Sequence, residues 1–257
     1  MTDRRNWTKN ELILAFALYL KLPFGKMHRN TPEIIELAEI IKRTPSAIAM
    51  RLSNFASLDP YHQKRGVKGL TGGISICQPI WDEFINNKEE LIYKSELILA
   101  EKQNLLIENK YSDLLKDTLE LKGETKERII KTRVNQSVFR QIILSTYSYK
   151  CAISGINLPE LLVASHIIPW SENENERLNP SNGICLSNLY DKAFDKGLIG
   201  IKENYTIILS QKIKTNSKEN YYERFFNCIE GLKLTLPERY LPKKEFLEYH
   251  LDTIFNK

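Results

Sequence analysis

Apolar residues near the start of the chain recur with helical spacing. Thr8 and Glu11 have the spacing of a capping box and precede the apolar run 12–20, which predicts a first buried helix. Pro32 and Pro45 each follow a threonine and open a segment whose apolar residues share one helical face. Because only a short break separates these two segments, we expect them to form a helix-turn-helix.

A polar stretch, residues 59–73, follows the third predicted helix and is expected to be a loop, with the wing of a winged helix as one possible form. Four basic side chains fall on the side that would face DNA: Arg51, Lys64, Arg65 and Lys68. The alternative is a plain helical bundle with no DNA-binding role. The histidines His28 and His62 are expected at the surface.

Residues 87–121 contain no glycine or proline, and a heptad pattern fits from Leu97 onward. Six of the eight seam positions are apolar or aromatic, among Leu97, Ala100, Asn104, Ile107, Tyr111, Leu114, Thr118 and Leu121. This pattern predicts a continuous helix that pairs two chains as a coiled coil and so makes a homodimer. The alternative is an amphipathic helix that packs on its own chain. Gly123 ends the segment.

The remainder of the chain begins with a basic helical stretch above an apolar stripe. Its basic side chains are expected to bind the backbone phosphates of DNA with an affinity that falls as salt rises. They are Lys126, Arg128, Lys131, Arg133 and Arg140. Alternation in 199–209 predicts strands, and the segment 246–251 predicts a closing helix. The chain therefore divides into a helical domain (1–86), a helical linker (87–123) and an α+β domain (124–257).

Composition narrows the possible functions only slightly. The net charge is +5, and its three segments carry +4, −2 and +3, so two basic ends flank an acidic middle. This mild excess is compatible with nucleic acid. The four cysteines are widely spaced without a Cys-x-x-Cys pair, which argues against a structural zinc site. The polar first ten residues and the lack of a long apolar run predict a cytoplasmic protein with no membrane span.

The segment 164–198 carries the candidate chemistry. His166 follows a predicted strand, a second strand is expected to end near Leu186, and a helix is expected from about Asn188. A strand hairpin with this helix across it would bring His166 close to the acidic residues of the helix. Metal-dependent cleavage of a phosphodiester needs a base for water, and an imidazole titrates near neutral pH.

These residues resemble the HNH endonuclease superfamily, and more closely its bacterial restriction-type branch. The resemblance covers about residues 133–255 and rests on motifs that occur in order: Cys151–Gly155, Ala164–Trp170, Asn182-Gly183 and Phe194–Leu198. It implies a ββα-metal fold, with one divalent metal ion held by a hairpin and a helix.

The resemblance also implies roles for individual residues. His166 corresponds to the general base, and Asn182 to the asparagine that braces the hairpin. Asp191 stands where many members carry a metal-binding histidine, and a carboxylate there suits Mg²⁺ or Mn²⁺. Ser165 replaces the metal-binding aspartate of the wider superfamily, which leaves Ser165 itself, water or Asp195 for that position. Tyr190 also stands where relatives have histidine.

Together these features predict a metal-dependent endonuclease that cuts double-stranded DNA, in restriction or anti-phage defence, with an N-terminal domain that selects the DNA. One alternative is an HNH nuclease triggered by a modified base or a small ligand. A second is a DNA-binding regulator that has lost catalysis, and a third is an enzyme acting on RNA.

Overall fold

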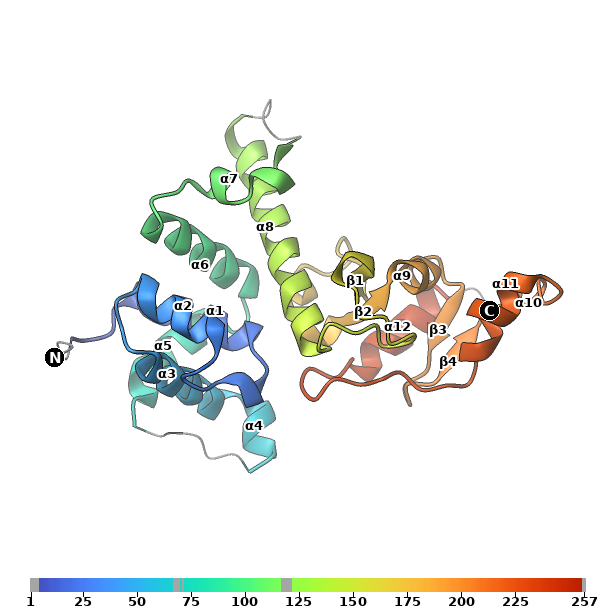
Figure 1. The fold of residues 1–257 in the computed structure, drawn as a ribbon, viewed down its shortest axis with the longest axis horizontal. Coiled ribbons are helices and arrows are strands. Elements are labelled where there is room, and N and C mark those ends of the chain that lie inside the picture. Colours follow the sequence, from blue (N-terminus) through green and yellow to red (C-terminus); the bar gives the residue numbers. More distant parts are fainter. Residues whose placement is uncertain (1–4, 67–69, 71, 117–121, 256–257) are drawn as a thin grey trace. The chain divides into compact units, whose positions relative to one another are not determined.

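The structure is a computed structural model that describes residues 5–66, 70, 72–116 and 122–255. The chain divides into two compact units, Met1–Val138 and Phe139–Lys257, and each is described by itself. Unit 1 runs from blue to light green in Figure 1, and unit 2 continues to red. None of the described helices is both long and apolar enough to cross a membrane.

Unit 1 is helical, as predicted. Its first part contains α1 (Lys9–Lys21), the 3₁₀ turn η1 (Phe24–Lys26), α2 (Pro32–Ile40), α3 (Pro45–Leu58), α4 (Pro60–Lys64) and α5 (Ile74–Phe84). The predicted capping box is present, since the Thr8 hydroxyl accepts from the Glu11 amide while the Glu11 carboxylate accepts from the Thr8 amide. The core of this part is aromatic, with the Phe16 ring 4.7 Å from Phe55 and 5.1 Å from Trp81.

The stretch after α3 is partly helical rather than a loop. Asp59 caps α4 by accepting from the Tyr61 amide, and Pro60 supplies a favourable first helical residue. Within the described part of 59–73 there is no strand, so no wing is seen there. The prediction that His62 lies at the surface is wrong. Its side chain is buried in α4 and its ring packs 4.4 Å from the Phe24 ring.

The prediction of one continuous helix over 87–121 is also wrong. Helix α6 (Lys88–Lys102) ends before Asn104, whose φ of 55° is left-handed, and short turns follow at α7 (Ile107–Lys110) and η2 (Ser112–Leu114). The chain then returns as α8 (Gly123–Thr146). Seam positions 118 and 121 lie outside the described residues.

This reversal buries part of the apolar seam within the same chain, at Ala100 and Ile107, while Leu97 and Leu114 are exposed. Ala100, Ile107 and Leu115 pack against Ile130 and Val134 of α8 in one buried cluster. A buried carboxylate also holds the turn, because Glu96 of α6 binds the side chains of Lys21, Lys110 and Tyr111. The predicted alternative, packing on the chain itself, is therefore the one that the structure has. The heptad pattern no longer supports a homodimer.

Unit 2 contains a hairpin followed by a helix, as predicted. Its ordered elements are β1 (Leu162–His166), β2 (Gly183–Ser187), α9 (Asn188–Asp195), β3 (Ile199–Ile201), β4 (Ile207–Leu209), α10 (Gln211–Lys214), α11 (Asn220–Phe225) and α12 (Lys244–Thr253), with short 3₁₀ turns between them. β1 pairs antiparallel with β2, with His166 opposite Gly183. β3 and β4 form a second antiparallel pair. Figure 1 shows α9 and α12 close to these strands.

The hairpin sits directly on the last turns of α8. At Gly183 an added Cβ would come within 2.4 Å of the Ile143 side chain and 2.8 Å of the Phe139 ring. Only a residue without a side chain allows this approach. Glycine at this position therefore lets the strand opposite His166 pack closely against α8.

Candidate active site

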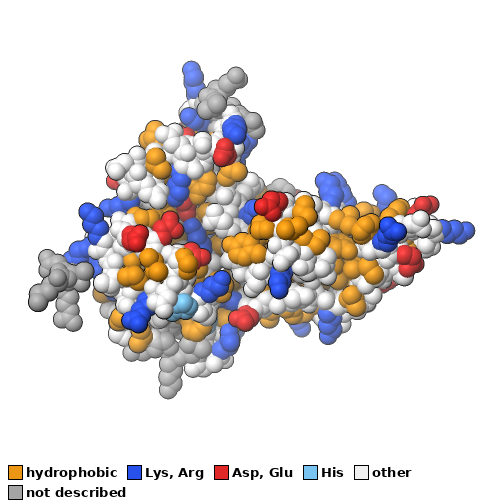
Figure 2. Space-filling model, viewed as in Figure 1, with side chains coloured by type: hydrophobic (Ala, Val, Ile, Leu, Met, Phe, Trp, Pro, Cys, Tyr) orange, Lys and Arg blue, Asp and Glu red, His pale blue; other side chains and the backbone are white. Residues whose placement is uncertain are grey.

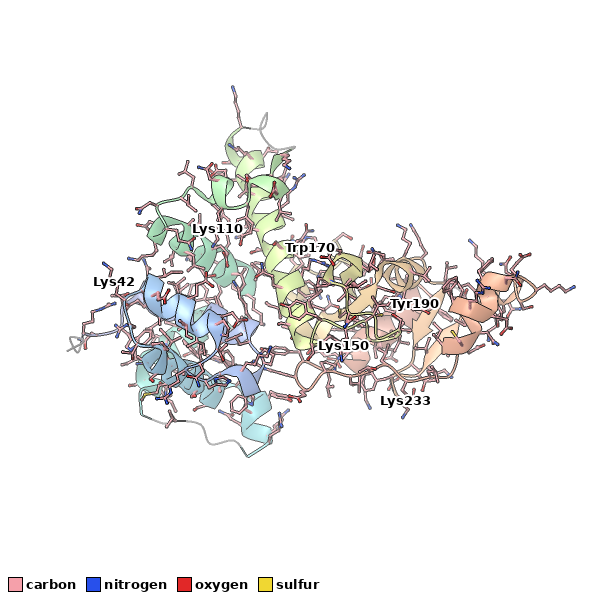
Figure 3. The ribbon with its side chains drawn as sticks, in the orientation of Figure 1. Lys42, Lys110, Lys150, Trp170, Tyr190 and Lys233 are labelled. Atoms are coloured by element: carbon pink, nitrogen blue, oxygen red, sulfur yellow. The ribbon has the colours of Figure 1, made fainter. Side chains whose placement is uncertain are left out.

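The hairpin and α9 enclose one side of a pocket of about 410 Å³. β1 contributes Ser165 and His166, the loop after it contributes Trp170, and α9 contributes Asp191 and Asp195. Figure 3 labels Trp170 in that loop and Tyr190 on α9. The structure thus brings together four of the five residues that the sequence predicts for catalysis and metal binding. The fifth, Asn182, lies behind the pocket.

His166 is held with one nitrogen available. Its ring stacks on Phe139 at 4.0 Å and meets the edge of Trp170 at 5.5 Å. Its Nε2 lies 2.9 Å from the carbonyl oxygen of Arg177. A carbonyl can only accept, so Nε2 carries the proton and Nδ1 keeps its lone pair. Burial lowers the pKa of His166 and outweighs the opposing effect of this hydrogen bond, so the ring is neutral at pH 7.

Asn182 braces the loop that holds His166. Its side chain is buried and bonds both backbone groups of Ile168, accepting from the amide at 2.8 Å and donating to the carbonyl at 3.1 Å. It also donates to the carbonyl of Glu176 at 3.2 Å. The next residue, Arg177, supplies the carbonyl that fixes the imidazole. The position of Asn182 therefore supports the bracing role that the resemblance implies.

Asp191 and Asp195 lie four residues apart on α9 and so share one helical face. Burial raises the pKa of Asp191, against smaller lowering effects from the Ser165 hydroxyl and Lys192. Burial also raises the pKa of Asp195, and the negative charge of Asp191 raises it further. Asp191 is half-buried and Asp195 is exposed, and two carboxylates that repel one another form a place where a cation is stabilised.

These groups fit a hydrated, oxygen-preferring cation. In the described residues no three His, Cys, Asp or Glu side chains lie close enough to hold a metal ion by themselves. Mg²⁺ does not need such a cage, because it keeps several waters and binds through one or two carboxylates together with substrate phosphate. The Ser165 hydroxyl is buried and lies close enough to Asp191 to affect the pKa of that carboxyl. Asp191 and Asp195 would hold the ion.

Three further titratable residues that the predicted site did not include line the pocket. Lys192 and Lys196 follow the two aspartates on α9 and place positive charge at the pocket. His250 of α12 also lines it; its ring stacks on Phe194 at 3.6 Å, and its Nε2 lies 3.0 Å from the Phe194 carbonyl. Each lysine directly follows one of the two aspartates, so the sequence itself indicates that the lysines lie near the site. No local pattern in the sequence connects His250 with α9.

Tyr190 does not take the place of a metal ligand. Its side chain is buried, and its hydroxyl donates to the carbonyl of Phe225 at 2.9 Å. It is not among the residues that line the pocket. The phenol thus anchors α9 to the segment at the end of α11.

The predicted DNA-binding residues fall into two groups. Lys64, Arg65 and Arg128 are exposed. Of these, Arg65 also donates to the Tyr61 hydroxyl at 2.9 Å. The remaining ones bind other groups of the chain: Arg51 stacks on Trp7 and donates to the Gly73 carbonyl, Arg140 donates to the carbonyls of Leu162 and Pro159, Arg133 donates to the Leu114 carbonyl, Lys131 pairs with Glu90 and Lys126 with Glu108. Lys68 lies outside the described residues. The face in Figure 2 shows its blue side chains scattered rather than gathered in one stripe.

Comparison with known proteins agrees with this geometry. Residues 151–202 match a family model described as HNH endonuclease. The matched segment includes β1, β2 and α9, and with them His166, Asn182, Asp191 and Asp195. No curated protein matches the chain. Residues 151–202, which carry the hairpin and α9, are therefore assigned by this match to the HNH endonuclease superfamily.

Proposed function

We propose that the protein is a divalent-metal-dependent endonuclease that hydrolyses phosphodiester bonds in double-stranded DNA. The observation that carries this proposal is the pocket in which the unprotonated Nδ1 of His166 shares a cavity with Asp191 and Asp195. A neutral imidazole beside paired carboxylates supplies a base and a cation site within one enclosure.

In this mechanism His166 Nδ1 removes a proton from water, and the oxygen attacks the phosphorus. The bond from phosphorus to the 3′ oxygen breaks, and the departing oxygen takes a proton from solvent, leaving a 5′-phosphate and a 3′-hydroxyl, as the family resemblance implies. The imidazolium that forms is stabilised by the Arg177 carbonyl on Nε2. Mg²⁺ or Mn²⁺ bound by Asp191 and Asp195 would neutralise the phosphate and stabilise the leaving oxygen. Lys192 adds positive charge at the pocket.

We further propose that unit 1 selects the DNA and that the protein serves in restriction or anti-phage defence. The support is the arrangement of α2 and α3 as consecutive helices joined by a short turn, with exposed Lys64 and Arg65 at the end of α4. A cut in both strands would require two active sites, and sedimentation of the protein with and without a DNA duplex would show whether two chains assemble.

A cleavage assay tests the catalytic proposal. Unmodified and cytosine-modified phage DNA are incubated with the protein and Mg²⁺ or Mn²⁺, in parallel with His166→Ala. An exposed histidine outside the pocket, His28, gives a matched control as His28→Ala. Metal-dependent fragments that persist in the control and vanish with His166→Ala support the nuclease. RNA of the same sequence, included as a substrate, separates a DNA enzyme from an RNA enzyme.

A regulator that has lost catalysis is the alternative suggested by Ser165 and Tyr190. It predicts tight DNA binding without cleavage by the unaltered protein in either metal. A nuclease triggered by a ligand is a second alternative, and it is favoured by a groove in unit 1 that Arg5, Lys9, Lys42 and Lys102 line.

A further inference from the structure

We propose that unit 1 contains a binding site for the phosphate groups of a nucleotide. The site is a groove of about 900 Å³ formed by the first turns of α1, the turn after α2 and the end of α6. This volume falls in the range of about 300–1,000 Å³ that is usual for small-molecule sites. The four cations that line it are Arg5, Lys9, Lys42 and Lys102. The proposal concerns binding alone and does not depend on the nuclease activity.

The groove keeps a surplus of positive charge. Glu11 is its single acidic lining residue, and it is buried and bound by two arginines, with Arg5 at 2.6 Å and Arg43 at 2.9 Å. Burial alone would raise the pKa of Glu11, but the hydrogen bonds from Arg43, Thr8 and Arg5 outweigh it and bring the pKa to about 2. This carboxylate is therefore already neutralised and does not cancel the lysines.

Two of the lysines have no acidic partner. In the described part of the chain neither Lys42 nor Lys102 forms an ion pair, and both side chains are exposed. Lys9 pairs with Glu83 at 2.7 Å, but both side chains are well exposed, so this pair is weak and open to competition by an anion. Figure 3 labels Lys42 near the end of α2. Its φ of 54° is one that usually favours glycine, yet the chain carries a lysine there.

The other walls of the groove suit the rest of a nucleotide. Leu14, Ile40 and Ile41 line it, and their buried or half-buried side chains offer apolar surface beside the cations. Asn10 and Thr8 add groups that can form hydrogen bonds. A few charged groups beside an apolar wall are what an organic phosphate requires, whereas a purely inorganic ion would make no use of the apolar surface.

Isothermal titration of the full chain tests the site. ATP, pyrophosphate and a short DNA duplex are titrated separately at low salt with EDTA, which prevents metal-dependent cleavage of the duplex. The variant Lys42→Glu/Lys102→Glu reverses the two unpaired charges. The matched control Lys26→Glu/Lys122→Glu makes the same change in charge at exposed lysines of unit 1 that do not line the groove. Because all four lysines are exposed, both variants are expected to melt near the temperature of the unaltered protein.

We expect ATP to bind the unaltered protein and the control, and to bind the groove variant roughly 100-fold more weakly, since each charged contact accounts for about tenfold. If instead only the duplex binds, and binding is lost in the groove variant alone, the groove is a phosphate site whose source is the DNA backbone. If none of the three ligands binds, or if both variants weaken binding equally, the proposal is wrong.

Discussion

Replacing Asn182 by alanine tests whether the hairpin loop is held as the structure indicates. The side chain is 1% exposed and makes three hydrogen bonds, two with the backbone of Ile168 and one with the carbonyl of Glu176. Alanine leaves a buried amide and two carbonyls without these partners. A buried polar group that loses its partner costs about 1–3 kcal/mol, and water can reach some of the carbonyls, so we expect a loss of about 3 kcal/mol in unfolding free energy.

That loss is a large share of the ~5–15 kcal/mol that keeps a typical domain folded. Urea unfolding followed by circular dichroism measures it. Asn175 lies in the same loop with an exposed side chain, and Asn175→Ala should change the unfolding free energy by less than about 0.5 kcal/mol.

The same substitution should slow cleavage even where the variant is still folded. Without the bond to the Glu176 carbonyl, the neighbouring Arg177 carbonyl loses its support and His166 is no longer held in one orientation. Cleavage is measured at a temperature at which circular dichroism shows both proteins folded. An Asn182→Ala protein that matches the Asn175→Ala control in both stability and cleavage would refute this account of the loop.

Four further results are expected. Because burial lowers the pKa of His166, cleavage should stay at its full rate as the pH falls through 6.5 and decline only below it; a midpoint at or above 6.5 contradicts this. Burial lowers the pKa of His250 to about 4. As the pH falls, the unfolded chain therefore binds a proton at this histidine before the folded chain does. The free energy of unfolding should fall by up to about 3 kcal/mol between pH 7 and 4. Over that pH range the His250→Phe variant should lose less free energy of unfolding than the unaltered protein, as measured by urea unfolding. Asp191→Asn should raise the Mn²⁺ concentration for half-maximal cleavage at least about tenfold, and equal metal dependence would exclude it as a ligand. Lys64→Ala/Arg65→Ala should reduce the slope of log affinity against log salt by about 1 to 2, measured by fluorescence anisotropy on duplex DNA.

Local patterns in the sequence were sufficient for the elements that carry the site. The capping pair Thr8 and Glu11 set the start of α1, because the groups that satisfy each other lie three residues apart. In the same way, the hairpin and α9 lie within one short segment, and the resemblance of that segment to HNH endonucleases predicted that His166 and Asp191 lie close together, as both line one pocket. The family match covers this same segment.

Contacts between distant segments could not be read in this way. Periodicity predicts that the seam of 87–121 is buried but not against what. The tertiary structure buries Ala100 and Ile107 against α8 of the same chain and leaves Leu97 and Leu114 exposed. A basic residue looks alike in sequence whether it faces solvent or a carbonyl, and only packing shows that Arg140 is engaged by the chain while Arg128 is exposed. His250 reaches the pocket through a partner 56 residues away. The sequence determined which faces must be buried and which residues can do chemistry, because these follow from neighbours in the chain; the tertiary structure decided their partners, because burial depends on which distant surfaces fit together.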